Sequence, residues 1–364
     1  MSDKLLTVIV PSFNMEEYLP KCLESLLVPD EELLQRLDVI VVNDGSKDKT
    51  SEIAHGFEAR FPDIFRVVDK RNGNYGSCIN AALPLASGFY VKVLDADDSV
   101  ATGGFTKLLS ALETEISSDS GSADLVVTDY ESVNSKGTAI ERIRYRFPIG
   151  AGRTLNEAEE YSPRFTIHSI VYKTDLLRKP GYRQSEGLSY TDTEWITEPM
   201  AAVNLVTYLP FVVTRYLVGR SGQTMEDATF ATRFQQVVRI TEGLVSRFPT
   251  ISLRCVPVSR TYYKARVIQM VSMVYQTWLL GWHGHRVRCN LRNLDRIVRE
   301  TPEIRSVVES FRLPSRIFPL RYVAARLRPH GLGFPLLSVL HAFLWARRLW
   351  HRVRDSFRQT EPKT

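Results

Sequence analysis

The sequence predicts an α/β protein with a mostly parallel sheet flanked by helices, followed by a helical C-terminal region. Two observations lead to this fold class. Continuously apolar runs alternate with helix-like segments through the first 130 residues, as expected when strands are buried on both faces of a sheet. Beyond about Ala228, the apolar side chains recur at helical spacing instead. The 364 residues, of which 44% are hydrophobic, are enough to bury a substantial core.

Five strands and four connecting helices are predicted in the first 130 residues. The predicted strands are the apolar runs at residues 5–10, 37–42, 65–69, 89–94 and 124–128. The predicted helices are residues 15–27, 49–60, 75–86 and 106–113, with Pro84 expected to end the third helix early. Parallel strands need crossovers of this length, and such crossovers are right-handed.

The middle of the chain is predicted to complete the same domain. Residues 150–152 (GAG) are predicted to form a loop, and residues 165–172 and 205–218 are predicted strands because they are rich in β-branched and aromatic side chains. We therefore predict one domain over residues 1–225, with halves at 1–130 and 131–225. A helical region is predicted for residues 226–330, and a separate C-terminal helix for residues 331–364.

The C-terminal segment is strongly basic. From Arg316 to the end there are ten Lys and Arg residues against two acidic ones, within a net charge of +6 for the whole chain. Residues 331–364 place arginines between apolar side chains at near-helical spacing, which is typical of a basic amphipathic helix in a membrane interface. A helix that packs on the protein with a solvated basic face is the alternative. We expect peripheral membrane contact and no nucleic acid partner.

The cysteines and the N-terminus bear on the cellular compartment. Four cysteines occur without a CxxC pair, which argues against a zinc site or a disulfide framework and favours a reducing compartment. The N-terminal MSDKLLTVIV lacks the basic region and cleavage site of a signal peptide, and no run approaches the ~20 apolar residues of a membrane-spanning helix. A cytoplasmic location, with attachment at the inner face of the membrane, is expected.

Polar clusters follow three of the predicted strands. Residues 11–14 (PSFN) follow the first strand, residues 43–46 (NDGS) the second and residues 95–98 (DADD) the fourth. Ligands of open α/β sheets bind beyond the carboxyl ends of the strands, so these clusters are expected to form one site. Asp44 is suited to accept a hydrogen bond from a nucleobase, and Gly45 allows close approach of the backbone. The alternative for this cluster is a turn with a helix N-cap.

The acidic cluster at residues 95–98 indicates a cation site. Three carboxylates directly after an apolar strand repel one another unless a cation offsets their charge. Asp95 and Asp97 share one face of an extended backbone, and oxygen ligands of this kind suit Mg²⁺ or Mn²⁺. A solvated acidic loop is the alternative. Neither GxxxxGK[ST] nor GxGxxG occurs, which argues against a P-loop protein and a dinucleotide-binding enzyme.

Four segments together resemble the successive motifs of family 2 glycosyltransferases, which have the GT-A fold. They are residues 8–14 (VIVPSFN), 41–48 (VVNDGSKD), 72–80 (NGNYGSCIN) and 88–98 (GFYVKVLDADD), and their order and spacing match over roughly residues 4–100. The resemblance implies that Asp95 faces the ribose and that Asp97 binds the Mn²⁺ or Mg²⁺ that bridges the diphosphate. The other implied nucleotide-sugar-binding residues are Pro11, Ser12, Asn14, Asp44, Asn74, Asn80, Ala96 and Asp98. Asn74 as a turn residue and Asn80 as a buried polar group are the alternatives.

The acceptor side of the site is predicted from the second half of the domain. Family members commonly have Glu-Asp where this chain has Thr191-Asp192, which makes Asp192 the candidate general base. Glu194 is the second choice, and a helix cap is the alternative role for Asp192. His168 is expected either to contact a phosphate or the acceptor, or to be structural. Residues 215–224 resemble the flexible segment that closes over the donor.

Arg220 or Gln223 of that segment would contact the diphosphate, unless the segment is only an exposed strand end and loop. The predicted function is an inverting glycosyl transfer of the hexosyltransferase type. A UDP-sugar is favoured as donor, and the acceptor is expected to be a glycan or a lipid-linked molecule in cell-surface polysaccharide or glycolipid synthesis. One rival is a nucleotidyltransferase, which would have a glycine-rich loop with a basic residue after the first strand. The other is a non-catalytic sugar-nucleotide-binding or membrane-scaffold protein, in which Asp192→Asn would be silent.

Overall fold

The fold is described from a computed structural model of the chain. The residues that the structure describes are 4–117, 121–145, 150–154, 165–178, 182–220, 223, 226–255, 257–280 and 287–310. The C-terminal helix predicted for residues 331–364 therefore lies outside the described residues. All four cysteines lie inside them, and none of these four forms a disulfide.

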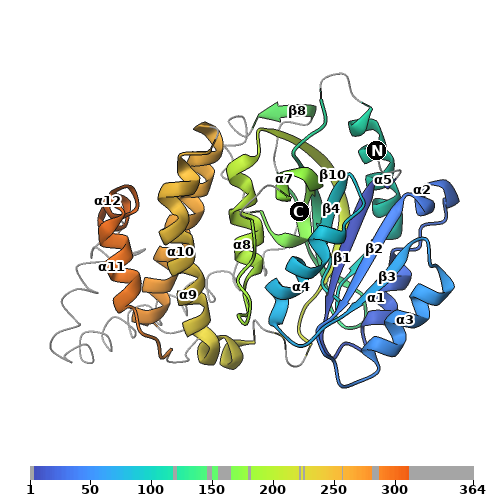
Figure 1. The fold of residues 1–364 in the computed structure, drawn as a ribbon, viewed down its shortest axis with the longest axis horizontal. Coiled ribbons are helices and arrows are strands. Elements are labelled where there is room, and N and C mark those ends of the chain that lie inside the picture. The colour runs from blue at the N-terminus through green and yellow to red at the C-terminus, as the bar shows by residue number, and fades with distance from the viewer. Residues whose placement is uncertain are drawn as a thin grey trace, which may run out of the picture. The chain divides into compact units, whose positions relative to one another are not determined.

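A ten-stranded sheet runs through the first part of the chain (Figure 1). The strands are β1 (Leu6–Ser12), β2 (Leu37–Asn43), β3 (Phe65–Asp69), β4 (Tyr90–Val93), β5 (Ser99–Val100), β6 (Leu125–Val133), β7 (Ala139–Ile143), β8 (Gly150–Thr154), β9 (Ile170–Lys173) and β10 (Leu205–Leu217). Their order is β3-β2-β1-β4-β9-β6-β10-β5, with β7 paired to β6 and β8 paired to β10. The predicted α/β fold class is confirmed.

The donor half of the sheet has the predicted parallel arrangement. Strands β3, β2, β1 and β4 pair in parallel, so their carboxyl ends lie along one edge. Beyond β4 the sheet becomes mixed, because β9 lies between β4 and β6 and is antiparallel to both. Only four residues long and preceded by a 3-10 turn, η2 (Ile167–Ser169), β9 is shorter than the strand predicted at residues 165–172.

Helices cover both faces of the sheet. One face is covered by α1 (Leu19–Ser25), α2 (Glu31–Gln35), α3 (Thr50–Arg60) and α5 (Thr102–Ile116), which pack on one set of alternate strand residues such as Val8 and Val10. The other face is covered by α4 (Asn74–Ala82), α7 (Thr174–Leu177) and α8 (Asp192–Thr197), which pack on the intervening residues such as Ile9. Both faces of the central strands are buried, which explains their continuously apolar sequences.

Several element boundaries differ from the prediction. The helix predicted at residues 15–27 begins only at Leu19, after a turn, whereas α5 extends beyond its predicted bounds at both ends. As predicted, the third helix ends early, and Pro84 lies in a 3-10 turn, η1 (Leu83–Leu85). The loop predicted at residues 150–152 is wrong, because these residues belong to β8, which pairs with β10. The glycine-rich composition indicated a loop, but pairing with β10 holds these residues in a strand.

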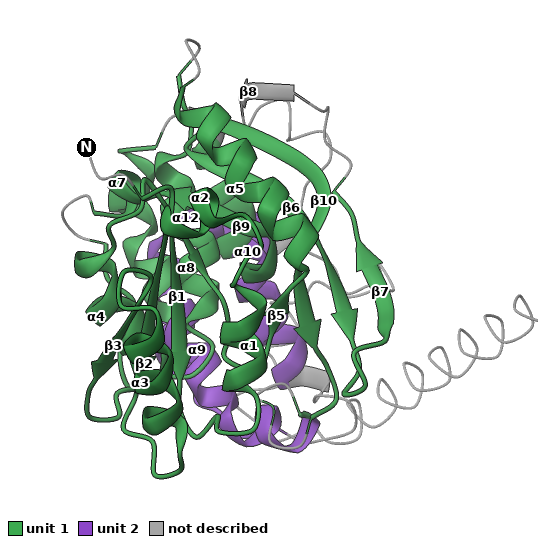
Figure 2. Cartoon of the chain, turned by 90° about the vertical axis from the view of Figure 1, so that its right-hand side faces the viewer, with its two compact units in different colours: residues 1–226, 242–267 green, residues 227–241, 268–364 purple. Residues whose placement is uncertain are grey.

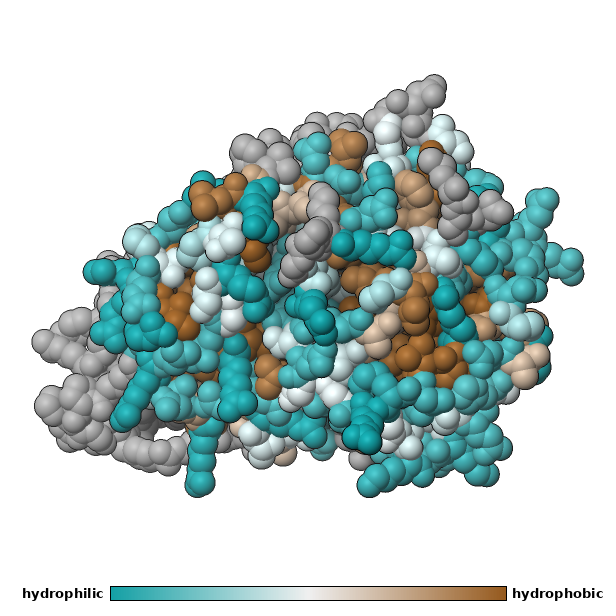
Figure 3. All heavy atoms as spheres, in the orientation of Figure 1, coloured by the Kyte–Doolittle hydropathy of each residue, from teal (hydrophilic) through white to brown (hydrophobic). Residues whose placement is uncertain are grey.

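The chain divides into two compact units. Unit 1 comprises residues 1–226 and 242–267, and unit 2 comprises residues 227–241 and 268–364 (Figure 2). The C-terminal region is helical as predicted, with α9 (Asp227–Ser252), α10 (Pro257–Leu280), α11 (Arg292–Glu300) and α12 (Pro302–Ser310). No helix within the described ranges is long and apolar enough to cross a membrane. Hydrophilic and hydrophobic residues are interspersed on the face shown in Figure 3.

Candidate active site

The polar clusters after β1 and β2 are joined by hydrogen bonds. The Asp44 backbone N–H donates to the Ser12 carbonyl at 2.8 Å, and the Asn14 N–H donates to the Ser46 hydroxyl at 3.0 Å. The Asn14 side chain accepts from the Lys47 N–H at 2.9 Å, with Asn14 in the left-handed region at φ 53°. Two strand ends that are 32 residues apart in sequence therefore form one polar edge.

Asp44 anchors the loop that leads into α4. Its buried carboxylate accepts from the Lys70 ammonium at 2.6 Å and from the backbone N–H groups of Gly73 and Asn74, each at 2.9 Å. Asn74 starts the helix with φ 64°, a left-handed conformation that asparagine tolerates well. The sequence predicted Asp44 as a base-reading residue, and the structure adds a second role in shaping the loop at residues 70–74.

Asn80 is engaged away from the polar edge. Its side-chain amide donates to the Gln184 carbonyl at 2.9 Å and to the Glu186 carboxylate at 2.8 Å, and its oxygen accepts from the Gln184 N–H at 3.0 Å. These bonds fasten α4 to the segment before α8. The alternative reading of Asn80 as a polar group with a structural role matches this geometry, whereas its donor-site role stays a prediction.

The acidic cluster follows β4 and is mostly buried. Asp95 accepts from the Tyr75 hydroxyl at 2.8 Å, and Asp98 Oδ1 accepts from the Leu217 N–H at 2.8 Å. Burial raises the pKa of Asp95 to about 7, and the charges of Asp98 and Asp97 add to this effect. Burial likewise raises the pKa of Asp98 well above its usual value. The cluster thus holds carboxylates that a cation would help to ionise.

His168 lies beside the acids. Its Nδ1 is 3.3 Å from Asp98 Oδ2, a close contact without hydrogen-bond geometry. Its ring stacks on Tyr216 with centroids 4.3 Å apart and contacts Tyr130 at 5.2 Å. Burial lowers the pKa of His168 to about 4, so the ring is neutral near pH 7. The sequence did not single out Tyr130 or Tyr216, because aromatic residues in strands are usually core.

Lys92 is a buried cation that the sequence analysis did not single out. Its side chain is fully buried in β4, and its ammonium donates to the His168 carbonyl at 2.8 Å. Burial lowers the pKa of Lys92 to about 8, against the opposing charges of Asp98 and Asp95. In the sequence, a lysine inside the apolar run Tyr90–Val93 was the feature that could have indicated a buried cation. Its ammonium is held in a fixed position beside the acids.

Asp97 binds the predicted donor-contact residue Arg220. The Arg220 guanidinium pairs with the Asp97 carboxylate at 2.5 Å, and both side chains are largely buried. The same guanidinium lies 5.4 Å from the centre of the Tyr18 ring. Gln223 closes a turn instead. Its side-chain N–H donates to the Leu217 carbonyl at 2.6 Å, and its side-chain oxygen accepts from the Gly219 N–H at 2.9 Å. Of the two residues predicted to contact the diphosphate, Arg220 is the one that lies at the acidic cluster.

Asp192, the candidate base, is the first residue of α8. Thr191 occupies the N-cap position, so Asp192 is not the cap of this helix. Burial raises the pKa of Asp192. Helix α8 packs against η2, the turn that carries His168. The preceding Tyr190 has φ 69°, an uncommon conformation for a bulky residue.

Glu194, the second-choice base, is held by structural contacts. Its fully buried carboxylate accepts from the Ser185 N–H at 2.7 Å, the Ser185 hydroxyl at 2.8 Å and the Arg247 guanidinium at 2.8 Å. Arg247 also pairs with Glu198, whose pKa burial raises to about 7. These bonds fix α8 to the segment before it and to α9, and so fix the position of Asp192. They favour Asp192 over Glu194 as the base.

The acidic cluster fits a divalent cation. Among the described residues, ligand atoms of Asp95, Asp98 and His168 lie within 4.8 Å of one another. Within the described residues, Asp98 Oδ2 is buried without a hydrogen-bond partner, and a coordinated cation would satisfy this oxygen. Carboxylate oxygens and a neutral imidazole suit Mg²⁺ or Mn²⁺. Asp97 lies outside this group and pairs with Arg220, and its role as the metal ligand stays a prediction.

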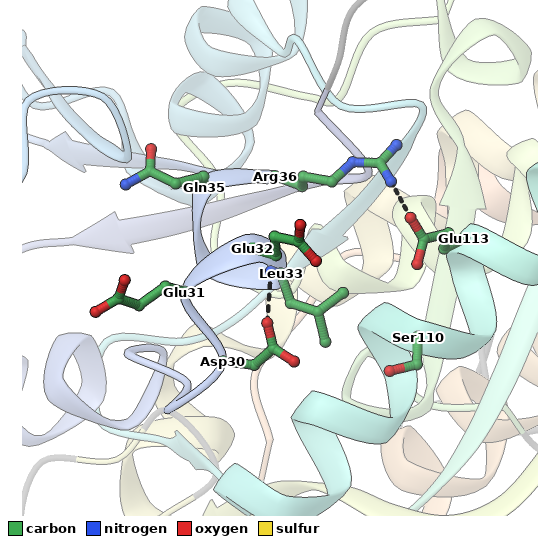
Figure 4. Close-up of a pocket in the computed structure, with 8 residues that line it drawn as sticks. All are labelled: Asp30, Glu31, Glu32, Leu33, Gln35, Arg36, Ser110 and Glu113. Carbon is green, nitrogen blue, oxygen red and sulfur yellow. Dashed lines mark hydrogen bonds and ion pairs between the residues drawn. The ribbon is translucent and has the colours of Figure 1, made fainter.

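A hollow lies at the opposite edge of the sheet from the candidate site. It has a volume of about 580 Å³ and is lined by Asp30, Glu31, Glu32, Leu33, Gln35, Arg36, Ser110 and Glu113 (Figure 4). Arg36 forms an ion pair with Glu113, and Asp30 caps α2. Because α2 directly precedes the start of β2, the hollow is at the amino ends of the strands, away from the candidate site.

Comparison with known proteins finds similarity to glycosyltransferases. Residues 7–179 match the sequence profile of the family described as "Glycosyl transferase family 2". The chain is 39% identical over 106 residues to "Uncharacterized glycosyltransferase MG025 homolog" of Mycoplasma pneumoniae, covering 29% of this chain and 35% of that protein. It is 26% identical over 248 residues to "Uncharacterized glycosyltransferase MG060 homolog" of the same species, covering 66% of this chain and 77% of that protein.

The matches differ in extent. The chain spans only 35%, 36% and 30% of the lengths of the first three curated relatives that it matches. Among solved structures, S. aureus TarS 1-349 in complex with UDP has a TM-score of 0.55 at 17% sequence identity, covering 99% of this chain and 93% of that chain. A likeness at this identity concerns the fold.

Proposed function

From the premise that residues 7–179 form a domain of glycosyltransferase family 2 with the GT-A fold, we propose that this protein transfers a sugar from a nucleotide-diphosphate donor to a hydroxyl acceptor. The observation that carries the proposal is that the polar clusters after β1, β2 and β4 follow the carboxyl ends of neighbouring parallel strands. Arg220 pairs with Asp97 there, and α8, which begins with Asp192, packs against the turn that carries His168. Carboxylates, a buried lysine and a neutral histidine in one place are hard to explain as a structural device alone.

UDP is the nucleotide that we propose first. Pro11, Ser12 and Asn14 would line the nucleoside, and Asp44 would read the edge of the base. Asp95, positioned by Tyr75, would accept a hydrogen bond from a ribose hydroxyl. The crystal structure of TarS that shares this fold was solved in complex with UDP, which supports testing this nucleotide before others.

The diphosphate is the part of the donor that needs cations. Asp97 would hold Mn²⁺ or Mg²⁺ together with the neighbouring Asp95 and Asp98. When bound, such an ion stabilises the negative charge of the leaving diphosphate. Arg220 would contact the same phosphates. Lys92 would remain in the core and keep the acids partly neutralised.

Asp192 would act as the general base in an inverting transfer of the hexosyltransferase type. It would take the proton of the acceptor hydroxyl while that oxygen bonds to the anomeric carbon of the sugar. The bond from the anomeric carbon to the phosphate oxygen breaks in the same step, and the nucleoside diphosphate leaves. The network of Glu194, Glu198 and Arg247 would keep α8, and with it Asp192, in register with the donor.

The acceptor that we propose is a glycan or a lipid-linked molecule in cell-surface polysaccharide or glycolipid synthesis. A lipid-linked acceptor would give a purpose to peripheral membrane contact through the basic residues 331–364. Flotation with vesicles that contain anionic lipid tests this contact. A chain ending at Pro335 that floats as well as the full chain would contradict it.

Calorimetric titration of UDP and then GDP, with and without Mn²⁺, tests the donor site directly. We expect one nucleotide to bind only with Mn²⁺ and its binding to be lost in Asp97→Asn. Metal-dependent binding of GDP alone would replace UDP in the proposal. The absence of binding for both nucleotides under every condition would refute the donor site.

A further inference from the structure

Two neighbouring acids hold the end of β10 in different ways. Asp98 accepts the backbone N–H of Leu217, the last residue of the strand, at 2.8 Å. Asp97 holds the side chain of Arg220, three residues further on. Between them, Gly219 has φ 83°, and a side chain there would meet no atom within 4 Å. The strand end is therefore fixed at its backbone by Asp98, independently of the ion pair between Asp97 and Arg220.

The two cations at the acidic cluster differ in their freedom to move. Lys92 is fully buried within β4, and its ammonium is fixed on the His168 carbonyl. The Arg220 side chain is 16% exposed and lies beyond the end of β10, over the ring of Tyr18. Lys92 is thus fixed in position, whereas Arg220 lies where it can change partners.

We propose that Arg220 and the divalent cation compete for Asp97, and that arrival of the cation transfers Arg220 to the diphosphate. The inference rests on the proposed function and deepens it. A guanidinium and a divalent cation that share the Asp97 carboxylate repel each other, so the binding of either weakens the binding of the other. Removal of Arg220 from Asp97 costs an ion pair, and the phosphate oxygens of the donor provide a new partner for the guanidinium.

Two binding constants with opposite responses to one substitution test this exchange. The first is Mn²⁺ affinity without nucleotide, measured from the electron paramagnetic resonance signal of free Mn²⁺. The second is UDP affinity at saturating Mn²⁺, measured by calorimetry. Arg220→Met should bind Mn²⁺ about tenfold more tightly than the unsubstituted protein, because a charge-assisted bond no longer competes. The same variant should bind UDP about tenfold more weakly, because the contact with the diphosphate is lost.

Arg66→Met is the matched control. Arg66 pairs with the buried carboxylate of Asp38 at 2.7 Å, at the amino end of β2 and away from the acidic cluster. Both affinities of this variant should equal those of the unsubstituted protein. Arg220→Lys retains a competing charge and should bind Mn²⁺ less tightly than Arg220→Met.

The outcomes separate this inference from the proposed function. If Mn²⁺ binds Arg220→Met no more tightly than the unsubstituted protein, while Asp97→Asn loses Mn²⁺, the competition is refuted and the donor site stands. If Mn²⁺ binds Asp97→Asn undiminished, the metal role of Asp97 is refuted, and the exchange with it. If Arg220→Met binds Mn²⁺ more tightly but its UDP affinity is unchanged, competition is supported and transfer of Arg220 to the diphosphate is refuted.

Discussion

Asp192 is the residue on which the proposed chemistry depends most directly. Asp192→Asn removes the proton acceptor while keeping the size of the side chain. We expect kcat for sugar transfer to fall by roughly 10²–10⁴, with UDP affinity in the presence of Mn²⁺ unchanged. Burial raises the pKa of Asp192, so kcat of the unsubstituted enzyme should also fall as the pH drops through that raised value. Steady-state kinetics across pH, with calorimetry for UDP, would measure both. An active Asp192→Asn enzyme would move the search to another base.

Asp95 and His168 should have opposite effects on stability in the acidic range. The pKa of His168 is lowered from 6.5 to about 4, so its contribution to stability is lost as the pH falls through this window. The pKa of Asp95 is raised from 3.8 to about 7, so the folded state takes up the proton first and gains stability as the pH falls. In the unsubstituted protein the two effects oppose each other.

Single substitutions should expose each effect. Relative to the unsubstituted protein, Asp95→Asn should lose roughly 2 kcal/mol of unfolding free energy between pH 6.5 and pH 4.5, and His168→Gln should gain roughly 2 kcal/mol. Urea unfolding at the two pH values, with EDTA to exclude metal ions, measures the difference. Parallel curves for all three proteins would show that burial does not shift these two groups in opposite directions.

Some roles of the site residues could be predicted from the sequence, and others could not. Asp44 and Asp97 are recognisable because each follows an apolar strand in a polar cluster. Lys92 and Tyr216 were missed, because their roles depend on which side chains lie opposite them across the sheet. Arg247 was missed for a similar reason, since 53 residues separate it from its partner Glu194. Chemistry that is carried by one segment can be predicted, whereas a partner from a distant segment requires the fold.

At the scale of elements, the contact of α5 with β10 is closest at a glycine. A Cβ atom at Gly104 would lie 1.8 Å from the Val212 carbonyl oxygen, whereas one at Gly103 would meet nothing within 4 Å. We expect Gly104→Ala to destabilise the protein by about 2 kcal/mol, because the helix must move away from the strand. Gly103→Ala is the matched control and should be neutral or stabilising by about 0.5 kcal/mol. Denaturant unfolding of the two variants checks this, and equal stabilities would contradict the close packing.

Predicted elements were most accurate where the apolar pattern was continuous. Strands β2 and β3 begin where the pattern predicts, and Pro84 ends α4 as expected. Strand β8 was missed because Gly150–Thr154 has little strand propensity, and its pairing with β10 decides the conformation. The position of β9 was equally unreadable, because sequence patterns predict the existence of a strand but not its neighbours.

At the scale of the whole molecule, donor binding should stabilise the folded state. A ligand that binds only the folded protein adds roughly 2.7 kcal/mol at a hundred times its Kd. For a chain of this size, UDP with Mn²⁺ should raise Tm by roughly 3 °C. Scanning calorimetry would measure this, and Asp97→Asn should show no rise under the same conditions. A similar rise in both proteins would mean that UDP binds without the proposed metal.

The insertion of β9 between β4 and β6 also has a consequence for synthesis on the ribosome. Strand β4 ends at Val93, but β9 begins only at Ile170, so the partner of β4 on this side emerges late. At roughly 5–20 residues per second, the nascent chain exposes an apolar, unpaired strand edge for several seconds. Such edges recruit other chains, which makes this interval the moment of greatest aggregation risk. Translation speed and chaperone capture over these residues should therefore govern the yield of folded protein.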